Sequence, residues 1–187
     1  TIAAAVAAAA TLPLHADNAP TAAPTGKTRA NPIGISTYSF WRFLDDSKVP
    51  VEQCIEQAAA MRFDGVEILR MQMNGQENTP TKQDNAYLQK FKQTAFREGV
   101  PLCGYSIHQG FVSPDEAVRQ KNIDLTLQCI EEAYAMGIPT MRLNTGRWGT
   151  TKSFDDLMKN RGIEPNLPGY TDDQGFEWVI SSIEKCL

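Results

Sequence analysis

The chain has 187 residues and a formal net charge of −4, with a sequence pI near 5.2. Hydrophobic residues make up 42% of it and charged residues 21%, which are values of globular proteins and exclude a disordered chain. The acidic balance argues against nucleic acid as a partner, because wide nucleic-acid binding is usually carried by a basic face. Beyond the N-terminus no apolar run reaches the roughly 18 residues of a membrane helix, so we expect no transmembrane anchor.

The N-terminal segment has the composition of an export signal. Residues 2–12 form an alanine-rich apolar run, Pro13 interrupts it, and Ala16 offers a small residue for cleavage. We therefore predict three segments: a signal-peptide remnant (1–16), a linker rich in Pro, Ala and Thr (17–30) and a folded body (31–187). This composition predicts a periplasmic or extracellular protein. The alternative is a cytoplasmic protein in which the alanine-rich run is a helix of the domain.

Export would permit disulfides, yet the four cysteines do not form a disulfide framework in the sequence. Cys54, Cys103, Cys129 and Cys186 are far apart, and none belongs to a CxxC pair. Each lies among apolar residues of a helical or strand-like segment. We therefore predict that they are small core residues.

The body alternates between strand-like and helical segments. Taken in chain order, it predicts a strand at 33–40, a helix at 49–61, a strand at 64–71, a helix at 84–98, a strand at 100–108, a helix from Pro114 to Met136, a strand at 138–146, a short helix near 153–160 and a helix from 176 to 187. Such alternation is typical of an α/β fold with a parallel sheet, since parallel strands need a crossover helix between them.

The three long helical segments each carry an apolar stripe. The expected core positions are Val51, Cys54, Ile55, Ala58 and Ala59 in the first, Leu88, Phe91 and Ala95 in the second, and Ile123, Leu127, Ile130 and Tyr134 in the third. Pro50 suits the first position of a helix, and Gly99 and Gly137 suit the residue just past a helix end.

Two architectures fit this order: an open doubly wound sheet and a section of an eight-stranded barrel. Each strand has an apolar face and a small or polar face, which favours a barrel with a polar lumen over a sheet covered by helices on both sides. In the third strand we expect Cys103, Tyr105 and Ile107 on the apolar face, and Gly104, Ser106 and His108 on the other. No strand is followed by GxGxxG or GxxxxGK[ST], so nucleotide binding loses its main support.

Polar and aromatic side chains gather where these strands end, which is where such barrels place their sites. The candidates for substrate binding are Tyr38, Phe40, Glu67, His108, Asn144 and Trp148. Glu67 lies inside a strand and needs a partner, which Arg142 or Arg70 could supply. His108 is the one histidine of the body, and either a structural or a pocket role fits it. Trp148 fits equally well as a pocket wall or as rim packing.

The strand regions resemble those of a known family. The segments PIGISTYSF, FDGVEIL, REGVPLCGYSIHQGF and AYAMGIPTMRLNTG, within about residues 32–148, are similar to successive strands of the xylose isomerase-like TIM-barrel family. The resemblance implies a (β/α)8 TIM barrel, of which this chain holds about the first four βα units. One departure is Arg62, where the family usually has a glycine after the first helix, and we expect it to lower cap stability slightly.

The resemblance also implies a function. Members include sugar phosphate isomerases and epimerases, in which a divalent metal (Mn, Mg, Co or Zn) assists proton transfer next to a carbonyl. The metal ligands and catalytic acids lie on later strands, so the resemblance places no catalytic residue and no complete metal site in this chain, and we expect the chain alone to be inactive. The positions that match the substrate pocket are Tyr38, Phe40, Glu67, His108 and Asn144, and His108 could also touch a metal. The implied partner is a sugar or polyol, and an oligomer is allowed.

Other functions remain open within the same fold, since fold does not settle function. One is a carbohydrate-binding barrel without catalysis, and another is a lyase or an endonuclease. Half a barrel exposes strand edges and an apolar interior, so we expect self-association of the isolated chain.

Overall fold

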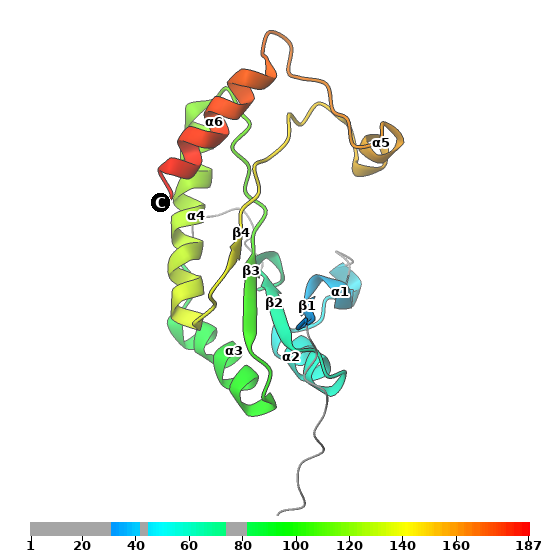
Figure 1. The fold of residues 1–187 in the computed structure, drawn as a ribbon, viewed down its shortest axis with the longest axis vertical. Helices are drawn as coiled ribbons and strands as arrows, with labels where there is room; N and C mark the ends of the chain where they lie inside the picture. Colours follow the sequence, from blue (N-terminus) through cyan, green and yellow to red (C-terminus); the bar gives the residue numbers. More distant parts are fainter. Residues whose placement is uncertain (1–30, 42–44, 74–81) are drawn as a thin grey trace, which may run out of the picture. The chain divides into compact units, whose positions relative to one another are not determined.

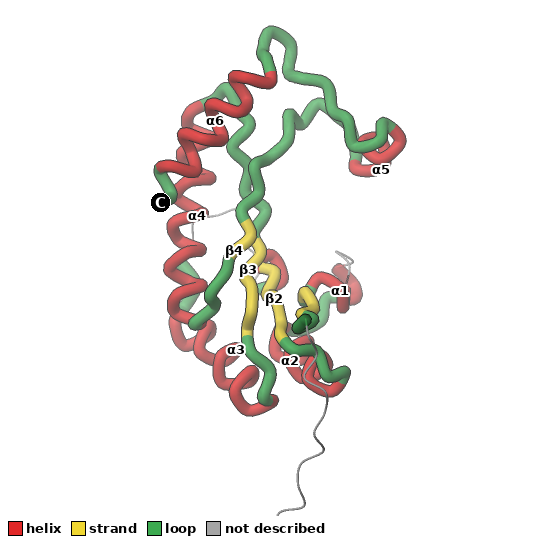
Figure 2. The backbone as a smooth tube through the Cα atoms, viewed as in Figure 1, coloured by secondary structure: helices red, strands yellow, loops and turns green. Residues whose placement is uncertain are grey.

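The computed structural model describes residues 31–41, 45–73 and 82–187, and the predicted signal segment and linker lie outside these residues. Figures 1 and 2 show how the described elements follow one another. The four strands are β1 (Gly34–Ser36), β2 (Gly65–Leu69), β3 (Leu102–Ser106) and β4 (Met141–Arg142). The helices are α1 (Tyr38–Trp41), α2 (Val51–Ala60), α3 (Asn85–Glu98), α4 (Glu116–Met136), α5 (Phe154–Lys159) and α6 (Asp172–Glu184), and short 3-10 helices lie at Asp45–Ser47 and Arg70–Gln72.

The strands form one sheet in the order β1-β2-β3-β4, and each neighbouring pair is parallel. Helices α2 and α3 follow β1 and β2 and pack against each other, α3 packs against α4, and α4 packs against α6. This arrangement confirms the predicted alternation of parallel strands and crossover helices. Residues Pro32–Leu187 form one compact unit.

The long helices begin and end where their side chains satisfy the free backbone groups. The carboxylates of Asp84 and Asp115 accept hydrogen bonds from the second backbone N–H of α3 and of α4. Gly99 and Gly137 end these helices in the left-handed conformation, with φ of 68° and 72°. Arg62 takes the same conformation after α2, at φ 63°, which a non-glycine residue adopts at some cost. The caps therefore confirm the two predicted glycine positions.

Several boundaries differ from the prediction. β1 ends at Ser36 because the next residue, Thr37, turns toward β2. The N–H of Thr37 donates to Glu67 O, and its hydroxyl accepts from Leu69 N. Tyr38 and Phe40, which were predicted in the strand, therefore lie in α1. β4 is only two residues long rather than nine. α6 begins at Asp172, four residues earlier than predicted, because Thr171 and Gln174 form a reciprocal capping box. Pro50 lies at the N-cap position, one residue before the first helical position that was predicted for it, and makes no side-chain cap bond.

The core lies between the sheet and the helices. β2 and β3 contribute Val66, Ile68, Leu102 and Tyr105, and Ile107 follows β3 directly; these side chains pack against the buried stripes of α2, α3 and α4. The predicted stripes of α2 and α3 are confirmed, apart from Ala59, which is only half-buried. No helix of the described residues is long and apolar enough to cross a membrane.

The predicted stripe of α4 is wrong except at Ile123, which is buried. Leu127, Ile130 and Tyr134 are exposed, the last to 84%. The buried face instead carries Ile123, Leu125, Thr126, Cys129, Glu132, Ala133 and Met136. Apolar residues occur on every side of α4, and its buried side includes the charged residue Glu132. A search for the most apolar stripe therefore selected the wrong side of the helix.

The predicted face of Cys103 is also wrong, because β3 contains a bulge. The pairing with β2 passes from Val66↔Leu102 directly to Glu67↔Gly104, so Cys103 has no partner residue. Its sulfur lies 2.8 Å and 3.1 Å from the positions that a Cβ would take on Gly65 and Gly34. Cys103 therefore shares the face of these glycines, opposite Tyr105. All four cysteines are free, and Cys54, Cys129 and Cys186 are buried, as predicted.

Candidate substrate-binding face

The sheet face that points away from the helices is built from small and polar residues. Ser36 pairs with Glu67, and Glu67 pairs with Gly104, so these three residues form a row across β1, β2 and β3. A Cβ on Gly104 would lie only 3.1 Å from Glu67 Cγ, so the glycine leaves room for the carboxylate stem. The face therefore presents one carboxylate on a floor of glycine and serine.

The carboxylate of Glu67 is held by a hydroxyl. Ser106 Oγ donates a short hydrogen bond to Glu67 Oε1 from the neighbouring strand. The predicted partner Arg70 is not used here, and Arg142 donates from Nη2 to the carbonyl of Ile107 at 3.3 Å. A hydroxyl partner fixes the direction of the carboxylate while leaving its negative charge in place.

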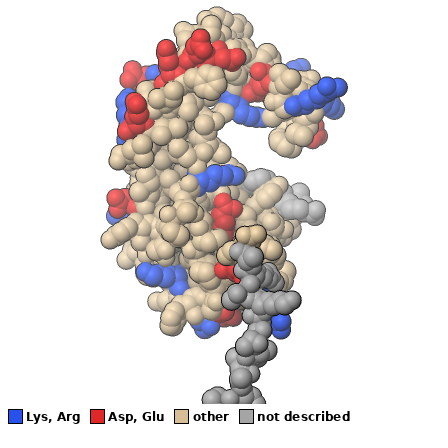
Figure 3. Space-filling model, in the orientation of Figure 1, with Lys and Arg blue, Asp and Glu red and all other residues tan. Residues whose placement is uncertain are grey.

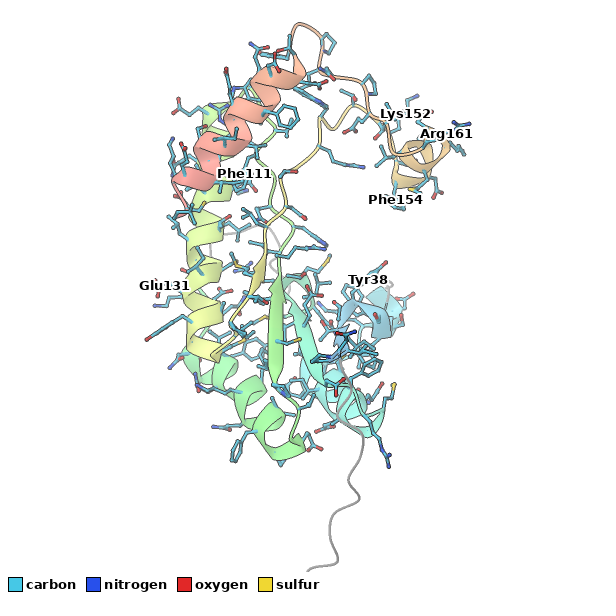
Figure 4. The ribbon with its side chains drawn as sticks, in the orientation of Figure 1. Tyr38, Phe111, Glu131, Lys152, Phe154 and Arg161 are labelled. Carbon is cyan, nitrogen blue, oxygen red and sulfur yellow. The ribbon has the colours of Figure 1, made fainter. Side chains whose placement is uncertain are left out.

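The remaining predicted residues lie in three places: past the ends of β3 and β4, on α1, and against α6. His108 and Asn144 each lie two residues past their strand, and β3 and β4 are paired at Ser106↔Arg142, so both half-buried residues follow the carboxyl edge of the sheet in the same register. Tyr38 is exposed on α1, where Figure 4 labels it, and Phe40 packs against the core. Trp148 is the exception, since it packs against α6 instead. The structure thus brings Glu67 and Ser106 together and places Trp148 in a separate cluster.

The family of the chain is shown by its similarity to known proteins. The sequence profile of the family described as "Xylose isomerase-like TIM barrel" matches residues 55–187. The chain belongs to the xylose isomerase-like TIM barrel family. This membership decides between the two architectures, and the four-stranded parallel sheet is a partial barrel of that family.

Solved structures with this fold include a sugar epimerase. The chain is similar to apo 3-keto-D-glucoside 4-epimerase from E. coli, with a TM-score of 0.50 and 15% sequence identity over 72% of this chain. It also matches a xylose isomerase-like TIM barrel/4-hydroxyphenylpyruvate dioxygenase fusion protein, with a TM-score of 0.42 and 19% identity over 59% of this chain and 16% of that one. The chain spans 44% of the epimerase chain. No curated protein sequence matches it.

The xylose isomerase-like TIM barrel family implies a divalent metal, but the described residues do not form a site that fits such an ion. Across residues 31–41, 45–73 and 82–187, no three His, Cys, Asp or Glu side chains come together in a way that could hold an ion. Glu67 and His108 are two isolated candidates for ligands. The part of the barrel that the structure describes therefore does not form a metal site by itself, and no chemical step is assigned through a metal.

Arg70 was expected at the polar edge, but the structure places it under the helices. Its Nε and Nη2 donate to the two oxygens of Glu132 in α4, at 3.0 Å and 3.2 Å, and both side chains are 1% exposed. Tyr105 donates to Glu132 Oε2 at 2.6 Å. Burial and the charge of Glu132 raise the pKa of Tyr105 well above its usual value, so the phenol stays a hydrogen-bond donor. This buried cluster joins the 3-10 helix after β2 to β3 and α4, and the sequence pattern missed it.

The loops that leave β3 and β4 cross at two glycines. Phe111 N donates to Thr145 O at 2.9 Å, and a Cβ on Gly146 would lie 2.9 Å from Gly110 Cα. Gly146 also has a φ of 98°, which favours glycine. Only residues without a side chain can pass each other at this distance, so the crossing fixes both loops beyond the carboxyl edge of the sheet.

The loop between β4 and α6 is held by Glu164. Its Oε1 accepts from the backbone and hydroxyl of Thr151, at 3.0 Å and 2.7 Å, and its Oε2 accepts from Gly149 N at 3.1 Å. Burial works to raise the pKa of this carboxyl, but the bonds from Thr151 and Gly149 and the charge of Arg147 outweigh it, so the pKa lies below its usual value of about 4.5. One carboxylate therefore closes a turn of about fifteen residues.

We expect acid to release this turn. Because the folded pKa of Glu164 is lowered, its contribution to stability is full above about pH 4.5 and is lost as the pH falls through the lowered value. The amide proton signals of Gly149 and Thr151, followed by NMR, should titrate together in this acid range. Glu164→Gln should abolish the shared titration, whereas Glu177→Gln on α6 should leave it unchanged. Independent titration of the two amides would contradict the proposed role of Glu164.

Proposed function

We propose that this chain provides the sugar-binding half of a sugar isomerase or epimerase that moves a proton next to a carbonyl with the help of a divalent metal. The observation that carries the proposal is the Glu67–Ser106 hydrogen bond on a glycine-lined face of a TIM-barrel sheet. A carboxylate whose direction is fixed can accept hydrogen bonds from the hydroxyls of a sugar, and small neighbours let a ring approach the strands.

The described residues bind and orient rather than react. Glu67 accepts from a sugar hydroxyl while Ser106 keeps the carboxylate in one direction. His108 and Asn144 follow the edge of the same face and offer further donors and acceptors. Holding a sugar in one orientation is the contribution that such groups make to catalysis, because the reacting carbon must be placed against an acid and a base.

The structural neighbour supports this chemistry by its name. A 3-keto-D-glucoside 4-epimerase inverts the carbon beside a keto group, which is a proton transfer next to a carbonyl. The similarity to the neighbour concerns the fold alone. The substrate and the reaction proposed for this protein therefore rest on the sheet face that carries Glu67 and Ser106.

Glu67→Gln should weaken sugar binding about tenfold, since the glutamine oxygen still accepts a hydrogen bond, and a bond to a charged acceptor is worth about 1 kcal/mol or a little more than one to a neutral acceptor. The dissociation constants for a panel of neutral monosaccharides can be measured on the chain by NMR titration. Glu131→Gln is the matched control, because Glu131 is exposed on α4, where Figure 4 labels it. Equal affinities of both variants and the unchanged chain would remove Glu67 from the site.

Deuterium exchange tests the reaction itself. The protein that contains the complete barrel, incubated in D2O with an aldose, a ketose or a keto-glycoside and with Mn²⁺ or Mg²⁺, should incorporate deuterium at the carbon next to the carbonyl. Binding without exchange above background would instead identify a carbohydrate-binding barrel.

A further inference from the structure

A second concave site lies beyond the carboxyl edge of the sheet, which we name the Trp148 pocket. It has a volume of about 210 Å³ and is lined by Val112, Thr145, Gly146, Trp148, Asp172, Gly175, Phe176 and Val179. These residues come from the loop after β3, the loop after β4 and the first two turns of α6. The pocket therefore joins the two loops that cross at Gly110 and Gly146.

The wall of the Trp148 pocket is held in place on both sides. A Cβ on Gly175 would lie 3.0 Å from Trp148 Cζ2, so the indole fits against α6 only because this helical position is glycine. Trp148 meets Trp178 edge to face at 6.0 Å between ring centroids, and Trp178 meets Tyr170 in the same way at 5.4 Å. A glycine inside a helix lowers stability by about 1 kcal/mol relative to alanine. The close approach of Trp148 explains why position 175 is nevertheless a glycine.

The chemistry of the lining selects a neutral, hydroxyl-bearing ring. Trp148, Phe176 and the valines offer an apolar surface, and Thr145 and Asp172 offer a hydroxyl and a carboxylate. Among the described lining residues Asp172 is the one charged side chain, and Figure 3 shows further acidic side chains over α6. Asp172 opposes a phosphate, while Arg119 lies over the ring of Trp178 at 5.5 Å and offsets part of this negative charge. The C–H face of a pyranose can cover the aromatic rings while its hydroxyls donate to the carboxylate.

The Trp148 pocket lies within reach of the Glu67 face. Arg142 ends β4 and is paired with Ser106, the partner of Glu67, and Thr145 follows Arg142 by three residues. Three residues span at most about 11 Å when fully extended, and the two strand spacings from β2 to β4 add about 10 Å, so Thr145 lies at most about 20 Å from Glu67. A ligand that occupies both places must extend from the Trp148 pocket along β4 and across β3.

We propose that the Trp148 pocket binds the second ring of a neutral glycoside whose first ring lies on the Glu67 face. This inference rests on the proposed function and narrows its substrate class from sugars and sugar phosphates to neutral glycosides. Phe176 and Asp172 determine this preference, since they contribute the exposed aromatic ring and the charge of the pocket.

The test is an NMR titration of the ¹⁵N-labelled chain with glucose, cellobiose and glucose 6-phosphate. The chain has three tryptophans, and Trp148→Phe assigns the indole signal of Trp148. Cellobiose should shift this signal and bind more tightly than glucose or glucose 6-phosphate. Phe176→Ser should weaken cellobiose about tenfold and leave glucose unchanged. Ile180→Ser is the matched control, because Ile180 is also exposed, at 56% against 65% for Phe176, and lies one turn further along α6.

A second matched pair tests the charge. Asp172→Asn should weaken cellobiose, whereas Asp173→Asn removes the same charge from the same helical turn and should have no effect on binding. An unmoved Trp148 signal at saturating cellobiose, equal effects of Phe176→Ser and Ile180→Ser, or tighter binding of glucose 6-phosphate would each overturn the inference.

The outcomes separate this inference from the proposed function. If Glu67→Gln weakens glucose but the variants of the Trp148 pocket change nothing, the pocket inference fails and the Glu67 face stands. If the pocket variants weaken cellobiose and Glu67→Gln changes nothing, the pocket stands and the assignment of Glu67 fails. Absence of binding by every sugar overturns both.

Discussion

Glu132→Gln is expected to lower the free energy of unfolding by about 3–5 kcal/mol, toward the lower end of that range. The substitution removes the carboxylate to which the buried guanidinium of Arg70 donates two hydrogen bonds, and losing one charge of a buried ion pair costs more than losing both. The glutamine amide can still accept one hydrogen bond from Tyr105 or Arg70, which recovers part of the loss. Urea unfolding followed by circular dichroism measures the change.

Two further variants isolate the cause. Glu131→Gln changes the neighbouring, exposed carboxylate of α4 and should alter stability by less than about 0.5 kcal/mol. The double variant Arg70→Met with Glu132→Leu removes both charges and should recover most of the stability, because apolar residues of similar size often replace a buried ion pair at little cost. A double variant as unstable as Glu132→Gln would show that packing, and not the loss of the Glu132 charge, sets the effect.

Gly146→Ala is expected to cost about 3 kcal/mol or more. Its φ of 98° costs roughly 1–3 kcal/mol for a residue with a side chain, and the new Cβ would meet Gly110 Cα at 2.9 Å and Phe111 N at 3.0 Å. Overpacking of this kind adds roughly 1–3 kcal/mol. Since the crossing also carries the Phe111–Thr145 hydrogen bond, the variant should weaken binding in the Trp148 pocket as well.

The same loop supplies the control for Gly146→Ala. Gly149 has a φ of 70°, but no atom lies within 4 Å of the position of its Cβ. Gly149→Ala therefore introduces backbone strain without a clash and should cost about 1–2 kcal/mol. Equal losses in the two variants, measured by urea unfolding, would contradict the close approach of the two loops.

Features that depend on neighbours in sequence could be predicted. Gly99 and Gly137 were predicted just past the ends of α3 and α4 because a helix often ends with a left-handed residue, and this need is local. The alternation of strands and helices likewise predicted the parallel sheet. The face of Glu67 and Ser106 followed from the period of two along a strand, although its use as a sugar site stays a prediction.

The failures share a physical cause, which is contact between residues far apart in sequence. The period of two predicts a face but not a partner, so Arg142 and Arg70 were both offered as partners of Glu67, and the pairing of Arg70 with Glu132, 62 residues later, was missed. The buried face of α4 was missed for the same reason, because its charged residue Glu132 is buried only through its pairing with Arg70. The role of Gly175 could not be predicted either, because it follows from the position of Trp148.

The unpaired residue Cys103 has a consequence for any comparison of related chains. One extra residue reverses the inside-outside parity of everything that follows it in β3. Deleting Cys103 from the chain would leave Gly104 beside Leu102 and keep Ser106 facing Glu67. A relative without the extra residue must therefore be aligned with a one-residue gap at Cys103. Without that gap, each side chain before the bulge would be assigned to the wrong side of the barrel wall.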